Sequence, residues 1–321
     1  MSGWRSRWRP MRLFLLAALA ALPLPAAAAY PEQDITLVIP SVVGGGFDSI
    51  ARALMPAMER HLPAHVNIIP QNVPTLGGGR SASIVYRAKP DGYTIGLFNI
   101  PGMLVVQQQG EVSYDLTKIS WIGSMGNDVY GIGVSAKSPV KSLADLRAIG
   151  KPVRFTAAGP ASTAYSATLI AAEMLGIKVE MIAGYKGSIE YVQAVVNGEG
   201  DAVVSVMPTL IRLQREGKMR VLATLEEHSP LPGVPDASAL RLPDLAKITL
   251  QRLLGGPPRL PADIVNILSD ALSKAMQDPE VVAWARRSDV PLAITSPAQA
   301  DRVLHEQIDF FERWKRYLKP S

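Results

Sequence analysis

Short apolar runs alternate with helical patterns along most of the chain. The first continuous apolar run, residues 35–39, ends at a proline and a group of glycines, as a strand buried on both faces often does. Apolar side chains then recur at helical spacing through residues 47–58. Further strands are expected at residues 66–69 and 93–98, with a helix over residues 79–86 between them. This order predicts βαβ units and a mostly parallel sheet.

The same alternation restarts after Trp121 and predicts a second lobe with its own core. Glycines follow several of these helical patterns, where they favour the left-handed conformation after a helix end. Ile189 belongs to one apolar helix face together with Val192, Val195 and Val196. The expected strands are 132–134, 153–157, 179–182, 202–206 and 221–224, and the expected helices are 142–149, 163–175, 189–197, 210–216, 264–272 and 303–314.

The N-terminal residues are typical of a secretory signal peptide. Four arginines precede an apolar run over residues 13–22, and a small-residue stretch ends at Ala29. The run is shorter than the roughly 20 residues of a membrane-spanning helix, which argues against the alternative of an N-terminal anchor. We therefore expect a signal peptide over residues 1–29, cleavage before Tyr30, and a periplasmic mature chain.

Removing this leader changes the charge of the protein. The whole chain carries +5, and the leader holds four arginines and no acid, so the mature chain carries +1. That balance gives no basis for a nucleic-acid-binding surface. Cysteine is absent, which excludes disulfides, thiolate nucleophiles and thiolate metal sites. The mature chain, about 290 residues without another spanning segment, is expected to be soluble, with one large domain or two ordinary ones.

Three glycine-rich loops each connect an expected strand to the start of an expected helix. Such loops expose backbone N–H groups where the helix dipole favours an anion, and in parallel sheets they meet beyond the carboxyl ends of the strands. Each loop alone could be only a tight turn, but three in one chain favour an anion-binding site. They contain Ser41, Gly44, Gly45 and Gly46, then Thr75, Gly77 and Gly78, and then Gly159, Ser162 and Thr163.

Charged residues beside these loops have two interpretations. Asp48 either caps the first helix and pairs with Arg52, or contacts the ligand; the first is favoured because a carboxylate repels an anion. Arg80 is either a cation for the ligand or a solvated helix residue. His61 and His65 are four residues apart, but a proline between them breaks the helix that would align them on a metal. Because no nucleophile-and-base motif is present, we expect no enzyme, no metal and no cofactor.

Short motifs follow one another in a fixed order through the mature chain. From Pro40 to Arg52 the sequence reads P-S-x-x-G-G-G-x-D-x-x-A-R, and residues 88–94 read A-K-P-D-G-Y-T. The later motifs are K-S-L-A-D-L at 141–146, Y-K-G at 185–187, G-x-x-D at 198–201 and L-P-x-V-P at 231–235.

In this order the motifs resemble the signatures of Bug-type receptors, the TctC-like substrate-binding subunits of tripartite tricarboxylate transporters. The resemblance spans roughly residues 30–314. It implies an α/β, two-lobe periplasmic-binding-protein fold of type II, with two mostly parallel sheets flanked by helices and a hinge. Lobe 1 would comprise residues 30–132 and 252–321, and lobe 2, residues 133–251, would be inserted into it.

The resemblance also implies a function and a set of binding residues. The protein would capture a small organic acid between its lobes and deliver it to membrane permease subunits, acting as a monomer without a nucleic-acid partner. The first two loops would hold the carboxylate, partly through ordered waters, and lobe 2 would add hydroxyl and amide contacts. The expected binding residues are Ser41, Gly44, Gly45, Gly46, Asp48, Thr75, Gly77, Gly78, Asn99, Gly159, Ser162, Thr163, Tyr185, Gly187, Ser188 and Asp201.

The chain departs from the family pattern in its loops. Thr75 and Leu76 stand where the family has glycine and alanine, Ala161 makes the third loop bulkier, and Gly184 replaces a proline. We infer an altered ligand end or pocket volume. Two other functions stay open at this point: a sensor that presents its ligand to a membrane signalling partner, and, with least support, an enzyme of small acids.

Overall fold

The computed structural model describes residue 1 and residues 30–74, 76–110 and 112–318. The expected signal peptide beyond Met1, and Thr75 in the second loop, therefore lie outside the described residues. Across the described ranges, none of the helices combines the length and the apolar character needed to cross a membrane.

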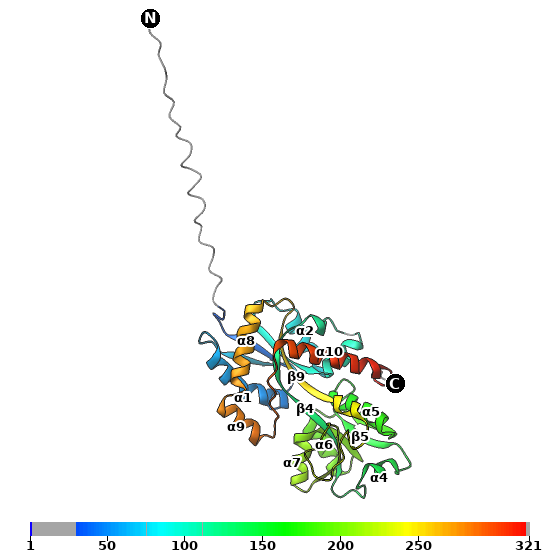
Figure 1. The fold of residues 1–321 in the computed structure, drawn as a ribbon. Helices are drawn as coiled ribbons and strands as arrows, with labels where there is room; N and C mark the ends of the chain where they lie inside the picture. Colours follow the sequence, from blue (N-terminus) through cyan, green and yellow to red (C-terminus); the bar gives the residue numbers. More distant parts are fainter. Residues whose placement is uncertain (2–29, 75, 111, 319–321) are drawn as a thin grey trace.

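Two α/β lobes lie one above the other, with the strand β4 (Ser120–Ser135) running between them (Figure 1). Its neighbour β9 (Thr249–Gly256) belongs to the lobe 1 sheet. The other elements of lobe 1 are β1 (Ile35–Ile39), α1 (Gly46–His61), β2 (Ile68–Asn72), α2 (Gly79–Tyr86), β3 (Thr94–Ile100), α3 (Gly102–Gln108), α8 (Ala262–Ala275), α9 (Pro279–Arg287) and α10 (Pro297–Trp314). Those of lobe 2 are α4 (Leu143–Arg147), β5 (Val153–Ala157), α5 (Thr163–Leu175), β6 (Val179–Ala183), α6 (Ser188–Asn197), β7 (Ala202–Val206), α7 (Met207–Arg215) and β8 (Met219–Thr224).

The strands form a mixed sheet in the order β2-β1-β3-β9-β4-β7-β5-β6, with β8 also paired to β4. The pairs β1–β2, β1–β3, β5–β6 and β5–β7 are parallel, as predicted for βαβ units. The antiparallel pairs all involve β4 or β9. β4 pairs with β9 as far as Val129 and with β7 and β8 from Tyr130 onward, so this strand connects the two lobes.

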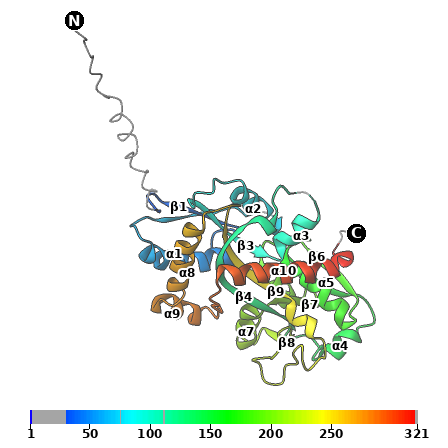
Figure 2. The ribbon, with the colours of Figure 1, turned by 45° about the horizontal axis from the view of Figure 1, so that its top comes forward.

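Apolar side chains fill both faces of the lobe 1 sheet. Ile35, Leu37 and Ile39 of β1 point into a cluster beneath α1 and α8, whereas Val38 points to the opposite face. Every second residue of a strand faces the same side, so a continuous apolar run such as this one is buried on both. The cluster on the second face continues into lobe 2, and α10 packs across β4 on that side (Figure 2).

The predicted fold class is confirmed, but two strand predictions were incomplete. Only residues 132–134 of β4 were expected, because its first half is interrupted by Gly123 and Gly126, whose positions coincide with shifts in the pairing register with β9. β9 was not predicted, because Gln251 and Arg252 interrupt its apolar run. Arg252 is nevertheless buried, since it forms an ion pair with Asp128 of β4.

Candidate functional site

A cleft of about 1010 Å³ lies between the two lobes, beyond the carboxyl ends of β1, β3, β5 and β6. Helix starts from both lobes face it, because each parallel strand is followed by a loop and a helix. Twelve of the sixteen predicted binding residues line this cleft: Ser41, Gly44, Gly45, Gly46, Gly77, Gly78, Asn99, Gly159, Ser162, Tyr185, Gly187 and Ser188.

The first loop presents the N-terminus of α1 to the cleft. Two of its N–H groups already have partners: Gly44 donates to Asp48 Oδ2 at 2.8 Å, and Gly45 donates to the carbonyl of Val42 at 3.0 Å. Among the described residues, no acceptor takes a hydrogen bond from the N–H of Gly46 or Phe47. These are the first two residues of α1, where N–H groups lack a partner within the helix. Their N–H groups are donors that remain available for an anion.

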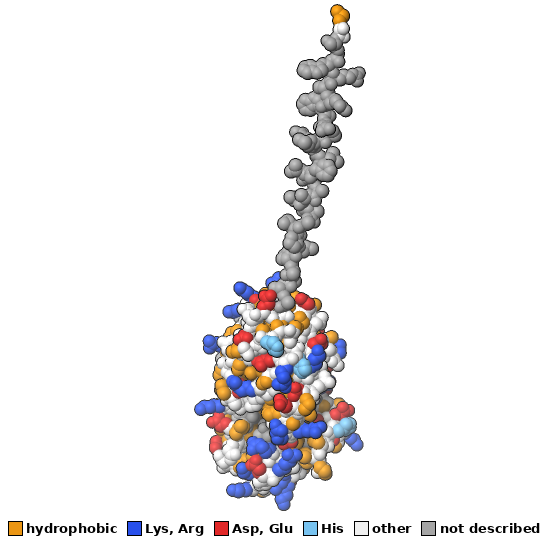
Figure 3. Space-filling view, turned by 90° about the vertical axis from the view of Figure 1, so that its left-hand side faces the viewer, with side chains coloured by type: hydrophobic (Ala, Val, Ile, Leu, Met, Phe, Trp, Pro, Cys, Tyr) orange, Lys and Arg blue, Asp and Glu red, His pale blue; other side chains and the backbone are white. Residues whose placement is uncertain are grey.

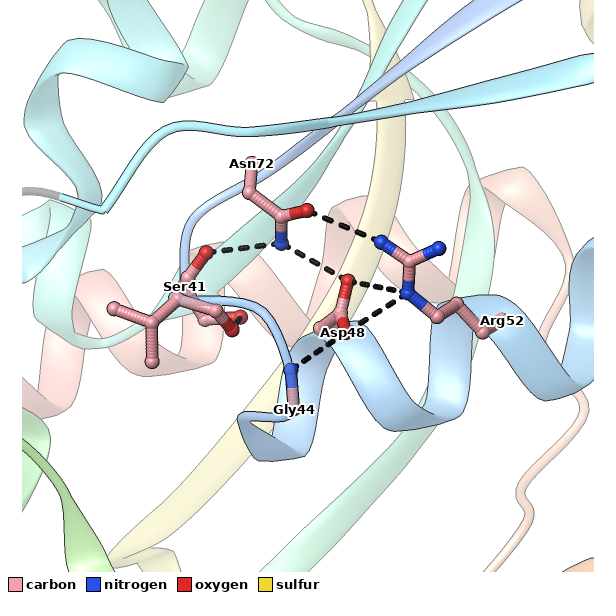
Figure 4. Close-up of polar contacts among 6 residues, drawn as sticks. Ser41, Gly44, Asp48, Arg52 and Asn72 are labelled. Atoms are coloured by element: carbon pink, nitrogen blue, oxygen red, sulfur yellow. Dashed lines mark hydrogen bonds and ion pairs between the residues drawn. The ribbon is translucent and has the colours of Figure 1, made fainter.

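The carboxylate of Asp48 holds this loop from beneath (Figure 4). It accepts hydrogen bonds from Gly44 N, from Arg52 Nε at 2.9 Å and from Asn72 Nδ2 at 3.0 Å, and Asp48 is only 1% exposed. Asn72 also donates to the carbonyl of Ser41 at 3.0 Å, which joins β2 to the loop. Burial raises the pKa of Asp48, but the hydrogen bonds from Arg52, Gly44 and Asn72 outweigh it, and the pKa lies below its ordinary value. Asp48 thus pairs with Arg52 and shapes the loop.

The second loop turns through two glycines in the left-handed region, Gly77 at φ 60° and Gly78 at φ 85°. A Cβ on Gly77 would lie 2.6 Å from Val106 Cγ2 and 2.7 Å from the carbonyl oxygen of Ala161 in lobe 2. Only glycine fits here without a shift of its neighbours. The loop therefore lies directly against lobe 2 at the inner end of the cleft.

Lobe 2 contributes the N-termini of α5 and α6. The hydroxyl oxygen of Ser162 caps α5 by accepting from Tyr165 N at 3.2 Å and also accepts from Gly159 N at 3.3 Å. Across the cleft, Thr163 Oγ1 donates to Asn99 Oδ1 of lobe 1 at 3.0 Å. This bond joins the lobes beside the cleft and places the start of α5 near that of α3, where a Cβ on Gly102 would lie 3.2 Å from Thr163 Oγ1.

Charged side chains are few in the cleft and all come from lobe 2. They are Lys186, Glu190 and Glu199. Tyr185 donates a hydrogen bond from its hydroxyl to Glu199 Oε2 at 3.0 Å, and partial burial together with that carboxylate raises the pKa of the tyrosine. Glu190 accepts from the backbone N–H of Lys186. The wall from lobe 1 carries none of the charged side chains that line the cleft.

Three predicted binding residues do not line the cleft, and the fourth that remains is not described. Asp48 lies beneath the first loop, Thr163 is buried in its contact with Asn99, and Thr75 lies outside the described residues. Asp201 pairs with Arg154 at 2.8 Å at the start of β5, whereas the cleft lies beyond the end of that strand. Asp201 was predicted from the G-x-x-D motif, but it lies at the end of the sheet opposite the cleft. We therefore leave it out of the proposed site.

The cleft also contains residues that the sequence did not single out as binding residues. Val42 and Val43 of the first loop line it, and so does Ile189, which was expected on the buried face of α6 but is 71% exposed. Ile189 is the second residue of α6 and is not among the buried residues of that helix, which begin at Tyr191. The polar residues Glu190, Gln193 and Asn197 recur at helical spacing, and this signal could have identified the face of α6 toward the cleft.

No group of three His, Cys, Asp or Glu side chains that could hold a metal occurs in the part of the chain that the structure describes. Charge is also mixed on the face shown in Figure 3, where Lys and Arg alternate with Asp and Glu over both lobes.

The fold and the cleft define a two-lobe solute-binding protein, and comparison with known proteins identifies its family. Residues 50–320 match the tripartite tricarboxylate transporter family receptor, TctC, so the chain belongs to this family. A relative from Cupriavidus necator, the UPF0065 protein in the gbd 5′ region, is 30% identical over 269 residues that cover 81% of this chain and 80% of the relative.

Solved structures share the fold at lower sequence identity. The periplasmic binding protein BugD is 20% identical with a TM-score of 0.75, and the match covers 90% of this chain and 98% of BugD. MatC from Rhodopseudomonas palustris with bound malate is 22% identical with a TM-score of 0.75, covering 90% and 100%. An R. palustris protein with adipate is 21% identical with a TM-score of 0.77, covering 90% and 98%. The proteins that share this fold thus include a periplasmic binding protein and two proteins solved with malate or adipate.

Proposed function

We propose that this chain is an exported receptor that captures a small carboxylate in the interlobe cleft and delivers it to the membrane subunits of a tripartite transporter. The observation that carries the proposal is the convergence of the N-termini of α1, α5 and α6 on one cleft. Each helix start favours negative charge, and glycines leave the backbone open to a ligand. The malate and adipate complexes of its structural neighbours agree with this ligand class.

The proposed binding residues lie in or next to the cleft wall and can donate hydrogen bonds. Gly46 offers a backbone N–H from the lobe 1 wall, and Phe47 offers the next one along α1. The hydroxyl of Ser41, which donates to the carbonyl of Val42 at 3.3 Å, would turn to the ligand. From lobe 2, Ser162 and Ser188 offer their hydroxyl groups. A carboxylate oxygen takes several hydrogen bonds at once, so donors from both lobes would bind it best when the lobes approach one another.

We propose further that the lobes close by rotation about β4 and β9, with lobe 1 formed by residues 30–132 and 252–321 and lobe 2 by residues 133–251. Closure stabilised by the ligand would distinguish the loaded receptor from the empty one, and this difference is what a membrane partner can recognise. Delivery from the periplasm requires removal of the leader, residues 1–29, during export.

Isothermal titration calorimetry of the mature protein against mono-, di- and tricarboxylates tests the proposal. At least one carboxylate should bind with a dissociation constant of about 1 μM or lower, which corresponds to about 8 kcal/mol of binding free energy. If no carboxylate binds and a cation binds tightly instead, the proposal is wrong.

A further inference from the structure

Apolar side chains stand exposed on both walls of the cleft. Val42 is 51% exposed, Val43 is 70% exposed and Ile189 is 71% exposed, and all three line the cleft. The other large apolar side chains that are exposed among the described residues are Met1, Ile69 and Ile294, and none of them lines it. The cleft thus gathers exposed apolar surface from two lobes, as a ligand site with an apolar interior does.

The first loop holds its valines toward the cleft by its own hydrogen bonds. The carbonyl of Val42 accepts from Gly45 N at 3.0 Å and from the hydroxyl of Ser41 at 3.3 Å, so the base of the loop is closed. The valines belong to the loop that leads into the N–H groups of Gly46 and Phe47 at the start of α1. An anionic end bound to those amides would leave the rest of the ligand against the apolar side chains.

The charged side chains of the opposite wall disfavour a second anionic end. Lys186, Glu190 and Glu199 are its charged side chains that line the cleft, and together they carry one net negative charge. A buried cation does lie behind the first loop, where the guanidinium of Arg252 sits 5.6 Å from the ring centroid of Phe47. Its charge is neutralised by Asp128, with which it forms a buried ion pair. A carboxylate that reached lobe 2 would meet two carboxylates and one ammonium, so the net charge of that wall opposes it.

From this lining we propose, resting on the proposed function, that the receptor takes monocarboxylates with an apolar body rather than di- or tricarboxylates. The carboxylate binds the amides of the first loop, and the apolar body lies between Val42 and Val43 of lobe 1 and Ile189 of lobe 2. The volume of about 1010 Å³ is at the upper end of the roughly 300–1,000 Å³ typical of ligand pockets, so it accommodates a body larger than that of malate.

Calorimetry on the mature protein with ligands of equal chain length tests this inference. Hexanoate is compared with adipate, and octanoate with octanedioate, so that each pair differs in one terminal carboxylate. We expect the monocarboxylate to bind about tenfold or more tightly in the pair that binds best, because the second carboxylate loses apolar contact and meets Glu190 and Glu199.

Variants separate the apolar contact from the charge. Ile189→Ser should weaken the best monocarboxylate about tenfold, whereas Ile69→Ser, an exposed position outside the cleft, should leave its affinity unchanged. The double variant Glu190→Gln with Glu199→Gln should reduce the difference in affinity between a monocarboxylate and the dicarboxylate of equal chain length.

The possible failures are distinguishable. If a dicarboxylate binds more tightly than its monocarboxylate partner, the apolar-body inference is wrong and the receptor function stands. An amino acid that binds more tightly than every monocarboxylate would also overturn it. If neither acid of any pair binds, and no other carboxylate does, the proposed function fails with it.

Discussion

Single residues decide whether the first loop can present free donors. Asp48 takes up the N–H of Gly44 and leaves those of Gly46 and Phe47 available. Its carboxylate is acceptor-only and is fixed by Arg52 and Asn72, so it gives the loop one conformation. Asp48 was a candidate ligand contact because of its position in the motif. In the structure its side chain instead supports the loop that forms the site.

Replacement of Asp48 by asparagine should destabilise the protein in a pH-dependent way. At neutral pH we expect the free energy of unfolding to fall by about 1–3 kcal/mol, because buried donors lose a charged acceptor. The pKa of Asp48 is lowered in the folded state, so its contribution is complete above the pKa of an unfolded aspartate, about 3.9, and is lost as the pH falls through the lower folded value.

Urea unfolding of the wild type and Asp48→Asn at pH 7 and pH 3 measures this effect. The difference between the two proteins should shrink at the lower pH. Asp270→Asn, at an exposed aspartate of α8, is the matched control and should differ little from the wild type at either pH. A deficit for Asp48→Asn that is equal at both values would contradict the assigned role.

Gly77→Ala tests the close approach of the second loop to lobe 2. The substitution should cost about 1–2 kcal/mol from the left-handed backbone and more from the contacts with Val106 and Ala161. Gly110→Ala is the control, because Gly110 has φ 82° but has no atom within 4 Å of its hypothetical Cβ. Thermal unfolding should show a clearly larger loss for Gly77→Ala; equal losses would mean that the interlobe contact is unimportant.

At the scale of elements, the paired strands β4 and β9 connect the two lobes. Asp128 of β4 and Arg252 of β9 form a buried ion pair there, and Arg252 Nε and Nη1 have no other hydrogen-bond partner among the described residues. A buried charge that loses its partner is costly, whereas an apolar replacement of both is tolerated much better.

Asp128→Asn should therefore reduce the free energy of unfolding by about 3–5 kcal/mol, since it leaves Arg252 buried without a countercharge. The double variant Asp128→Leu with Arg252→Met should recover most of that loss. Chemical denaturation of both variants measures the difference. If the double variant is as unstable as Asp128→Asn, the uncompensated charge of Arg252 is not the cause of the lost stability.

The elements also show what the sequence could predict. β1, β5 and β7 were predicted at their observed bounds, because short runs rich in apolar residues, each close to a glycine or a proline, leave few alternatives. β9 was missed because its burial of Arg252 depends on Asp128, which is 124 residues away in the chain. Twelve predicted binding residues line the cleft. The exposure of Ile189 was not predicted, because the apolar spacing of α6 was taken as its buried face and the polar spacing of Glu190, Gln193 and Asn197 was not used.

At the scale of the whole molecule, the account requires the lobes to approach one another around a ligand. Small-angle X-ray scattering with and without the best carboxylate of the calorimetric panel measures this change. The radius of gyration should decrease on binding, because rotation about β4 and β9 closes the cleft. An unchanged radius with saturating ligand would show that this receptor binds without closure.

The central claim is that free amides at the start of α1 hold the carboxylate, and Gly46→Pro tests it most directly. Proline is well tolerated at the first position of a helix, and Gly45 before it already has φ −71° and ψ 168°, so the fold should persist while one donor is removed. Gly46→Ala keeps the N–H and has no atom within 4 Å of its added Cβ.

Calorimetry with the best carboxylate compares these two variants. The account predicts that Gly46→Pro binds about tenfold or more weakly than Gly46→Ala, because a hydrogen bond to a charged acceptor is worth about 1.5–3 kcal/mol. Equal affinities for the two variants, with both proteins folded, would contradict it.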